Sequence, residues 1–205
     1  MMILEIEHIS KSFGTQRVLD DMSLTVDRGE VVGLLGGNGA GKTTLLRIAT
    51  RLVEPDAGRV LFCGHPVCQA DMGQIGYLPE ERGLYRRAAA GEQAVFMARL
   101  KGLSARDAEA AVHSWFDRLG IADWWSRPVG RLSKGMQQKL QFIVTVAHSP
   151  RLLVLDEPFS GFDEANAAML ADQIQRLSSE GTAILLSTHN RDAVGLCNKT
   201  VSLSS

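Results

Sequence analysis

The sequence predicts an α/β fold with a mainly parallel sheet at its core, an antiparallel β subdomain on the N-terminal side and an inserted helical subdomain. Three observations support this prediction. Residues 2–9 alternate between apolar and polar, and 18–26 also have the apolar spacing of a strand. Residues 88–147 show a helical pattern instead. Elsewhere, short apolar runs alternate with helical segments, as parallel strands do when helices cover their sheet.

The N-terminal part is expected to begin with two strands, at 2–9 and 18–26. The polar segment 10–16 between them contains a glycine and predicts a turn that carries Phe13. A further short strand is expected at 59–62, after a turn that contains Pro and Gly.

A glycine-rich segment, 36–44, lies between an apolar strand at 31–35 and a helical pattern at 42–52. It matches the phosphate-binding P-loop, in which backbone N–H groups and a helix N-terminus face an anion. Lys42 would pair with the β- and γ-phosphates, and the Thr43 hydroxyl would bind Mg²⁺. A chance glycine-rich turn is the alternative, but the motif is complete and has the expected flanks, so a P-loop nucleoside triphosphatase fold is predicted. The predicted nucleotide contacts in this segment are Gly36, Gly37, Asn38, Gly39, Ala40, Gly41, Lys42, Thr43 and Thr44.

The helical part follows a strand expected at 75–79. Apolar residues at helical spacing between 108 and 119 form one face, and Ser104 is a suitable N-cap for that helix. A later helix begins near Ser133. With Gly135 just inside it, this helix start offers N–H groups to an anion, although a plain N-cap would look the same.

The core resumes with the apolar strand 152–155, followed by a helix at 165–180, a strand at 183–186, a short helix at 190–196 and a strand at 200–203. Ligands of such sheets bind at the carboxyl ends of the parallel strands. The P-loop, the acidic pair after residue 155 and the pair 188–189 all lie at those ends, so we expect them to meet at one edge.

Asp156 and Glu157 are the acidic pair. Asp156 is predicted to hold Mg²⁺, and Glu157 to orient or deprotonate an attacking water. The alternative is a solvated acidic turn after a strand.

Composition excludes several function classes. The net charge of −1 gives no electrostatic case for binding nucleic acid. The apolar runs are far below the ~20 residues of a membrane span, and no signal peptide is visible. Cys63, Cys68 and Cys197 lack the spacing of a zinc finger or a disulfide framework and are assigned no function.

Together these motifs resemble the ATP-binding cassette of ABC transporters, over essentially the whole chain. Residues 36–43 match its Walker A motif, 132–137 its LSGGQ signature, 152–157 its Walker B motif and 160–163 its D-loop. The resemblance implies a single ABC ATPase domain over 1–205. Its ATP-binding core would be 1–79 and 150–205, and its Q-loop and helical subdomain 80–149.

The resemblance also implies a head-to-tail dimer with a second copy of this chain, in which each ATP lies between the P-loop of one copy and the signature of the other. His189 would contact the γ-phosphate, and Phe13 would stack on adenine, although a phenylalanine is more often a core residue. The D-loop's Asp163 joins the nucleotide contacts. The signature contacts would be Ser133, Lys134, Gly135, Met136 and Gln137.

Departures from the family pattern are informative. Gly37 stands where the family usually has Pro, Lys134 replaces the first signature glycine, and the Q-loop glutamine appears as Glu80, which could still hold Mg²⁺. The combination of segments 78–85 and 132–138 resembles bacterial export-type ATPases, such as sodium-export and drug-resistance systems, that pair with a separately encoded permease.

In the family, the Q-loop region receives the permease. Residues 80–87 are therefore the expected contact, with Trp115, Trp124 and Trp125 nearby, although core packing is an equal alternative for Trp115. The protein would then be cytoplasmic and peripheral on the inner face of the cell membrane.

Two other functions stay open: a soluble cassette protein of DNA repair or translation, and a nucleotide-binding module with little hydrolysis. The first usually carries long coiled-coil insertions or two cassettes, and the second is motivated by Glu80 and Lys134. Family members usually continue past the last strand expected here, so the chain is either minimal or truncated. The transported substrate is not readable from the sequence.

Overall fold

The protein is described by a computed structural model that covers residues 1–81, 83–189 and 194–203. The first of its two sheets is antiparallel, with strand order β2–β1–β4–β5. The strands of this sheet are β1 (Met2–Phe13), β2 (Gln16–Asp27), β4 (Ala57–Phe62) and β5 (His65–Pro66).

The second sheet is parallel throughout, with order β6–β7–β8–β3–β9. Its strands are β3 (Val31–Leu35), β6 (Ile75–Leu78), β7 (Leu152–Asp156), β8 (Ala183–Thr188) and β9 (Lys199–Ser202). The sheet prediction is thus confirmed in both parts, parallel core and antiparallel N-terminal side.

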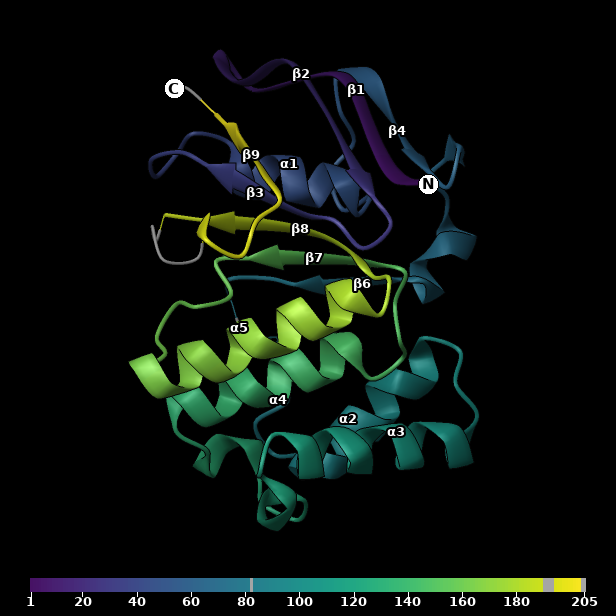
Figure 1. The fold of residues 1–205 in the computed structure, drawn as a ribbon, viewed down its shortest axis with the longest axis vertical. Coiled ribbons are helices and arrows are strands. Elements are labelled where there is room, and N and C mark those ends of the chain that lie inside the picture. The colour runs from purple at the N-terminus through teal and green to yellow at the C-terminus, as the bar shows by residue number, and fades with distance from the viewer. Residues whose placement is uncertain (82, 190–193, 204–205) are drawn as a thin grey trace.

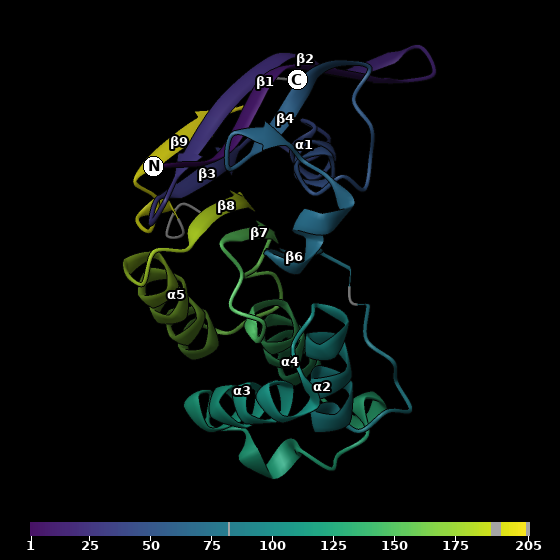
Figure 2. The same cartoon turned by 90° about the vertical axis from the view of Figure 1, so that its right-hand side faces the viewer.

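The helices form two layers around the parallel sheet (Figures 1 and 2). One helix, α1, lies between the two sheets, and the others lie on the opposite face of the parallel sheet. The α-helices are α1 (Lys42–Ala49), α2 (Ala90–Leu100), α3 (Ala105–Arg118), α4 (Lys134–Val146) and α5 (Glu164–Ser179). Three short 3₁₀ helices are η1 (Gln69–Gly73), η2 (Ala122–Trp124) and η3 (Val129–Arg131).

Strand β7 shows why the core has two layers. All five of its residues are buried, as expected for a strand covered on both faces. Leu152 and Val154 belong to the apolar cluster that includes α1, whereas Leu153 and Leu155 belong to the cluster that includes α4 and α5. Asp156 is the last residue of β7 and therefore lies at the carboxyl ends of the parallel strands.

Two predicted boundaries are wrong. The expected turn at 10–16 is mostly strand, because β1 continues pairing with β2 as far as Phe13, through irregular register. The carboxylate of Asp56 accepts hydrogen bonds from the Ser12 N–H and the Lys11 ammonium, both at 2.7 Å, which ties this polar stretch down. Helix α1 ends at Ala49 rather than residue 52, since Arg51 adopts a left-handed φ of +59°.

Other elements follow the predictions more closely. Ser104 caps α3 by accepting a hydrogen bond from the Asp107 N–H at 3.1 Å. Trp115 is buried and packs edge-on against Phe142, with ring centroids 5.8 Å apart, so core packing accounts for it. The predicted helix at 190–196 falls largely outside the described residues, and β5 and η1 were not foreseen.

A buried histidine follows α4 and predicts a pH dependence of stability. Burial, and then the nearby positive charge of Lys101, lower the pKa of His148 from 6.5 to about 4. An unfolded chain therefore binds a proton that the folded chain does not, between about pH 6.5 and 4, and folding loses stability as the pH falls through this window. We expect this residue to remove roughly 2 kcal/mol of unfolding free energy between pH 7 and pH 5.

The measurement is urea unfolding at both pH values for the native chain and for His148→Leu. The variant's stability should fall less between pH 7 and pH 5, by about that amount, because the remaining groups titrate alike in both proteins. Equal losses in the two proteins would contradict the prediction.

Candidate functional site

The glycine-rich segment joins β3 to α1 as predicted. Gly41 is the residue before the first helical turn and has a φ of +92°, which L side chains rarely adopt. A Cβ there would lie 2.8 Å from both the Leu19 side chain and the Val18 carbonyl oxygen. No side chain caps the N-terminus of α1, and no acidic residue occupies its first turn. The first N–H groups of α1 are therefore available to an anion.

Lys42, the first residue of α1, brings a buried positive charge to this loop. Its side chain is only 7% exposed, and its ammonium donates hydrogen bonds to the carbonyl oxygens of Gly36 at 2.7 Å and Gly37 at 3.2 Å. The same nitrogen lies 3.8 Å from Oε1 of Glu157. A buried ammonium held by neutral carbonyls and one carboxylate is well placed to bind a phosphate.

Asp156 and Thr43 come together across the sheet edge, as predicted. The Thr43 hydroxyl donates a hydrogen bond to Asp156 Oδ1 at 3.2 Å, and the Ser187 hydroxyl donates to the same oxygen at 2.7 Å. Asp156 is 1% exposed, and its other oxygen, Oδ2, is buried without a hydrogen-bond partner among the described residues. A hydroxyl beside a carboxylate with an unsatisfied oxygen is a set of hard oxygen donors, which suits Mg²⁺.

Glu157 is held in a strained conformation next to this pair. Its φ is +47°, in the left-handed region that non-glycine residues rarely adopt. Its N–H donates to the Ser187 hydroxyl at 2.9 Å, and its Oε2 lies 2.9 Å from Nδ1 of His189. The carboxylate thus stands between Lys42 and His189. Backbone strain of this kind is often found where function determines a side chain's position.

Ser187 is a site residue that the sequence reasoning missed. Its hydroxyl links the two acidic residues. It donates a hydrogen bond to the Asp156 carboxylate and accepts one from the Glu157 N–H. The parallel pairing of β7 with β8 places it directly beside Asp156. A small polar residue at the carboxyl end of the neighbouring strand is the signal that could have identified it.

Phe13 stands apart from the loop. It ends β1, is 52% exposed and lies 5.5 Å from the Lys11 ammonium, measured to the ring centre. A cavity of about 440 Å³ lies beside the P-loop, between the start of β2 and the end of β9. Its wall includes Val18, Gly39 and Ala40, but Phe13 is not among the lining residues.

The predicted signature residues lie at the start of α4. Ser133 is the N-cap, whose hydroxyl accepts from the Met136 N–H at 3.2 Å, while the Gln137 amide donates to the Leu132 carbonyl at 2.9 Å. Gly135 faces the Phe162 ring, and Lys134 is exposed. In the described part of the chain, no hydrogen bond or ion pair links 133–137 with 36–44. Figure 1 shows α4 beginning on the side of the molecule where β7 and β8 end.

Two other predicted residues lie away from the Thr43–Asp156 pair. Asp163 caps α5, because its carboxylate accepts from the Asn166 N–H at 2.8 Å. Glu80 is exposed in the loop after β6, which Gln141 of α4 ties down by donating to the Pro79 carbonyl at 3.1 Å. Within the described residues, no hydrogen bond or ion pair joins Glu80 to Thr43 or Asp156, so the predicted metal set is brought together only in part.

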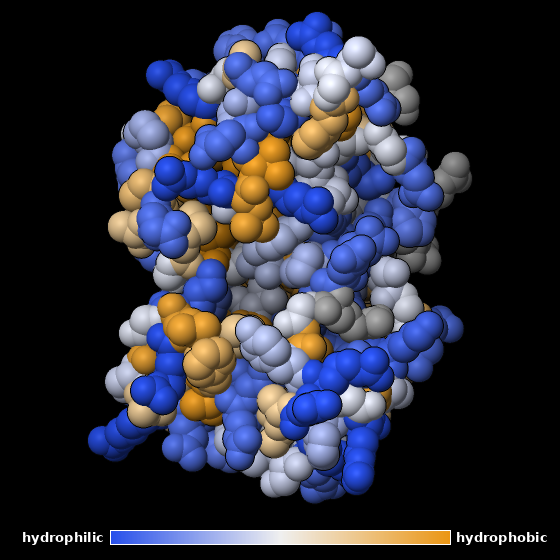
Figure 3. Space-filling view, turned by 180° about the vertical axis from the view of Figure 1, so that it is seen from behind, coloured by the Kyte–Doolittle hydropathy of each residue, from blue (hydrophilic) through white to orange (hydrophobic). Residues whose placement is uncertain are grey.

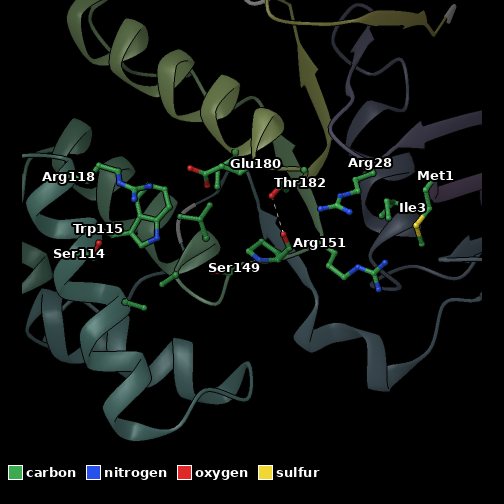
Figure 4. Close-up of a pocket in the computed structure, with 16 residues that line it drawn as sticks. Met1, Ile3, Arg28, Ser114, Trp115, Arg118, Ser149, Arg151, Glu180 and Thr182 are labelled. Atoms are coloured by element: carbon green, nitrogen blue, oxygen red, sulfur yellow. Dashed lines mark hydrogen bonds between the residues drawn. The ribbon is translucent and has the colours of Figure 1, made fainter.

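A separate pocket of about 550 Å³ lies at the opposite edge of the parallel sheet (Figure 4). It is lined by residues that precede β3, β7 and β8, including Arg28, Arg151 and Thr182, and by Arg118 from the end of α3. None of the predicted nucleotide or metal contacts borders it. The chemistry described above is therefore concentrated at the carboxyl edge alone.

Several known proteins are similar to this chain in sequence. The ABC transporter family matches residues 19–160. The uncharacterized ABC transporter ATP-binding protein YhaQ of Bacillus subtilis is 43% identical over 192 residues, covering 94% of this chain and 64% of YhaQ. The Nod factor export ATP-binding protein I of Sinorhizobium fredii is 35% identical over 200 residues, covering 96% of this chain and 58% of that protein. This chain therefore spans less than two thirds of either relative.

A solved structure of the ATP-binding subunit of an ABC transporter has a TM-score of 0.90 to this chain at 32% identity, covering 98% of this chain and 85% of that one. Within the described residues, no helix combines the length and apolar character needed to cross a bilayer. The family match spans the P-loop, the start of α4 and β7, and the chain belongs to the ABC transporter family, as one of its ATP-binding cassettes.

Proposed function

We propose that this chain binds Mg·ATP at its P-loop and hydrolyses it to drive a separate membrane permease. The observation that carries this proposal is the Glu157 carboxylate, which stands between Lys42 and His189 and next to the Thr43–Asp156 pair. A base, a phosphate-binding cation and a set of metal ligands thus lie at one edge of the sheet, where P-loop enzymes need them.

The residues have distinct roles in this proposal. Lys42 and the N–H groups at the start of α1 bind the β- and γ-phosphates and offset their charge. Glu157 accepts a proton from the attacking water, and His189 orients the Glu157 carboxylate and contacts the γ-phosphate. Thr43 and Asp156 would hold Mg²⁺, which when bound neutralises charge on the phosphate oxygens. Ser187 positions both acidic residues through its hydroxyl.

We further propose that the active form is a head-to-tail dimer of two copies. Ser133, Lys134 and Gly135 form the start of α4, and within the described residues they make no hydrogen bond or ion pair with their own P-loop, which leaves them free to face the nucleotide of a second copy. Phe13 and Asp163 would complete the nucleotide contacts. Hydrolysis then requires both chains.

The proposed permease contact is the loop at 80–87, together with a groove lined partly by β6, the strand that precedes this loop. This groove, about 490 Å³ in volume, is lined by the end of α1, by η1, and by residues of β6, α2 and α4. Leu52 is 61% exposed and Leu100 is 67% exposed, so two large apolar side chains border the groove at the surface. Figure 3 shows apolar surface on both sides of a hollow on the face turned away in Figure 1. An amphipathic helix of a membrane permease fits such a groove.

This contact would hold the protein at the inner face of the cell membrane. The direction of transport is proposed to be outward, since the relatives include a protein named for Nod factor export. Glu80, exposed in the loop after β6, would respond to the permease.

The experiment is a steady-state ATPase assay of the purified chain at several protein concentrations. We expect hydrolysis that stops when EDTA removes Mg²⁺, with an activity per chain that rises with concentration as dimers form. An absence of turnover would favour a binding module with little hydrolysis. Turnover with a constant activity per chain would contradict the dimeric site.

A further inference from the structure

A cluster of three potential metal ligands lies far from the P-loop, in the hairpin that follows β4. His65, Cys68 and Asp71 each offer one ligand atom, and the three atoms lie within 4.8 Å of one another. They come from a single seven-residue segment, in which His65 is in β5, Cys68 precedes η1 and Asp71 is inside η1. We propose that these three side chains bind one zinc-class transition-metal ion, with water as the fourth ligand.

The distances suit such an ion. Zinc in proteins is bound by nitrogen or oxygen at about 2.1 Å and by sulfur at about 2.3 Å in a tetrahedron, so neighbouring ligand atoms lie roughly 3.4–3.8 Å apart. No two of the three atoms are more than 4.8 Å apart, so they need to approach by roughly 1.4 Å at most. The segment is short, so rotation of the His65 and Cys68 side chains can supply that movement.

Charge and donor type also agree. Asp71 is 4% exposed, so its carboxylate is buried beside the other two groups. A buried carboxylate and one thiolate would cancel the charge of a divalent ion. Imidazole, thiolate and carboxylate together are the donor set of zinc rather than of magnesium or calcium.

The backbone already orients the carboxylate for this role. The Cys68 N–H donates to Asp71 Oδ2 at 2.8 Å, and the Cys68 side chain accepts from the Asp71 N–H. These two bonds cap η1, and a cap requires only positions 68 and 71. It does not account for His65, whose Nε2 lies 3.1 Å from Asp71 Oδ1 while its side chain is 51% exposed. That exposure leaves the imidazole side open to an ion and a water.

A metal here would act on the wall of the groove described above. Residues Gln69, Met72 and Gly73 of η1 line that groove, and the Met72 carbonyl accepts a hydrogen bond from the Lys101 ammonium at 2.7 Å. An ion joining β5 to η1 would fix this wall relative to the antiparallel sheet. The site itself does not depend on ATP hydrolysis, so its test is separate from that of the proposed function.

The test uses Co²⁺ as a coloured substitute for zinc, added to the metal-free full-length chain without nucleotide. We expect a thiolate-to-cobalt absorption band that saturates at one ion per chain and disappears when Zn²⁺ is added. Cys68→Ser should abolish the band, and His65→Gln should weaken Co²⁺ binding by at least about tenfold, a loss that even an outer partner of a metal site can cause. Cys63→Ser, which removes a thiol from the same hairpin, should leave the band unchanged.

The same variants also show whether a loss of the band is due to misfolding. Serine at position 68 still offers an oxygen to the Asp71 N–H, so the circular dichroism spectrum of Cys68→Ser should match that of the native chain. The proposal is overturned if the native chain gives no thiolate band, if the band survives Cys68→Ser, or if Cys63→Ser removes it.

Discussion

Replacing Glu157 by glutamine is expected to lower ATP turnover by about 10²- to 10⁴-fold, the usual contribution of a general base. Glutamine keeps the size and the hydrogen-bonding geometry of the side chain but cannot accept a proton. The Glu157 carboxylate lies beside Lys42 and His189. Replacing it with a neutral side-chain amide removes a negative charge from the phosphate site, so ATP binding should be unchanged or stronger. The measurement is steady-state phosphate release together with equilibrium binding of ATP.

Glu164→Gln is the matched control. It makes the same chemical change at an exposed residue in the first turn of α5, outside the site. Its turnover should equal that of the native chain. If Glu157→Gln retained more than about a tenth of native turnover, the role of Glu157 as the base would have to be abandoned.

Replacing Lys42 by alanine is expected to weaken ATP binding by about 100-fold, or roughly 2.7 kcal/mol. The buried ammonium is the positive charge nearest the loop's carbonyl oxygens, and its removal leaves the Glu157 carboxylate facing the phosphates without a counter-charge. Titration of a fluorescent ATP analogue measures this change directly.

Lys139→Ala provides the comparison for charge alone. Lys139 lies on α4, where its ammonium is 6.0 Å from the centre of the Trp124 ring. Its loss should leave ATP affinity within about twofold of native. Equal losses of affinity in the two variants would show that net charge, rather than the P-loop contact, determines binding.

Periodicity and turn signals predicted most of the fold because they record local preferences and burial. The buried run at 152–155 and the helix after Ser104 were readable in this way. The length of β1 was not, since its polar end is held by Asp56, which is 43 residues beyond Phe13 in sequence. β5 and η1 are too short to produce a period.

The site was predictable to the extent that it follows strand ends. The contact of Thr43 with Asp156 follows from a P-loop and an acid at one sheet edge. The bridging role of Ser187 depends on which strands are neighbours, and strand order is not written in local sequence. Sequence spacing also could not predict the position of Glu80. Within the described residues, its carboxylate forms no hydrogen bond or ion pair with Thr43 or Asp156.

The central claim is that two copies share each ATP, and the molar mass of Glu157→Gln in Mg·ATP tests it most directly. Light scattering should give the mass of one chain without nucleotide and of two chains with ATP.

Adding Lys134→Glu should return the mass to one chain while ATP still binds each copy. An acidic residue at the exposed start of α4 suits that helix end but would repel a partner's phosphates. Lys139→Glu, with the same charge change farther along α4, should still give the dimer. A single-chain mass with ATP bound, or a dimer that survives Lys134→Glu, would contradict the shared site.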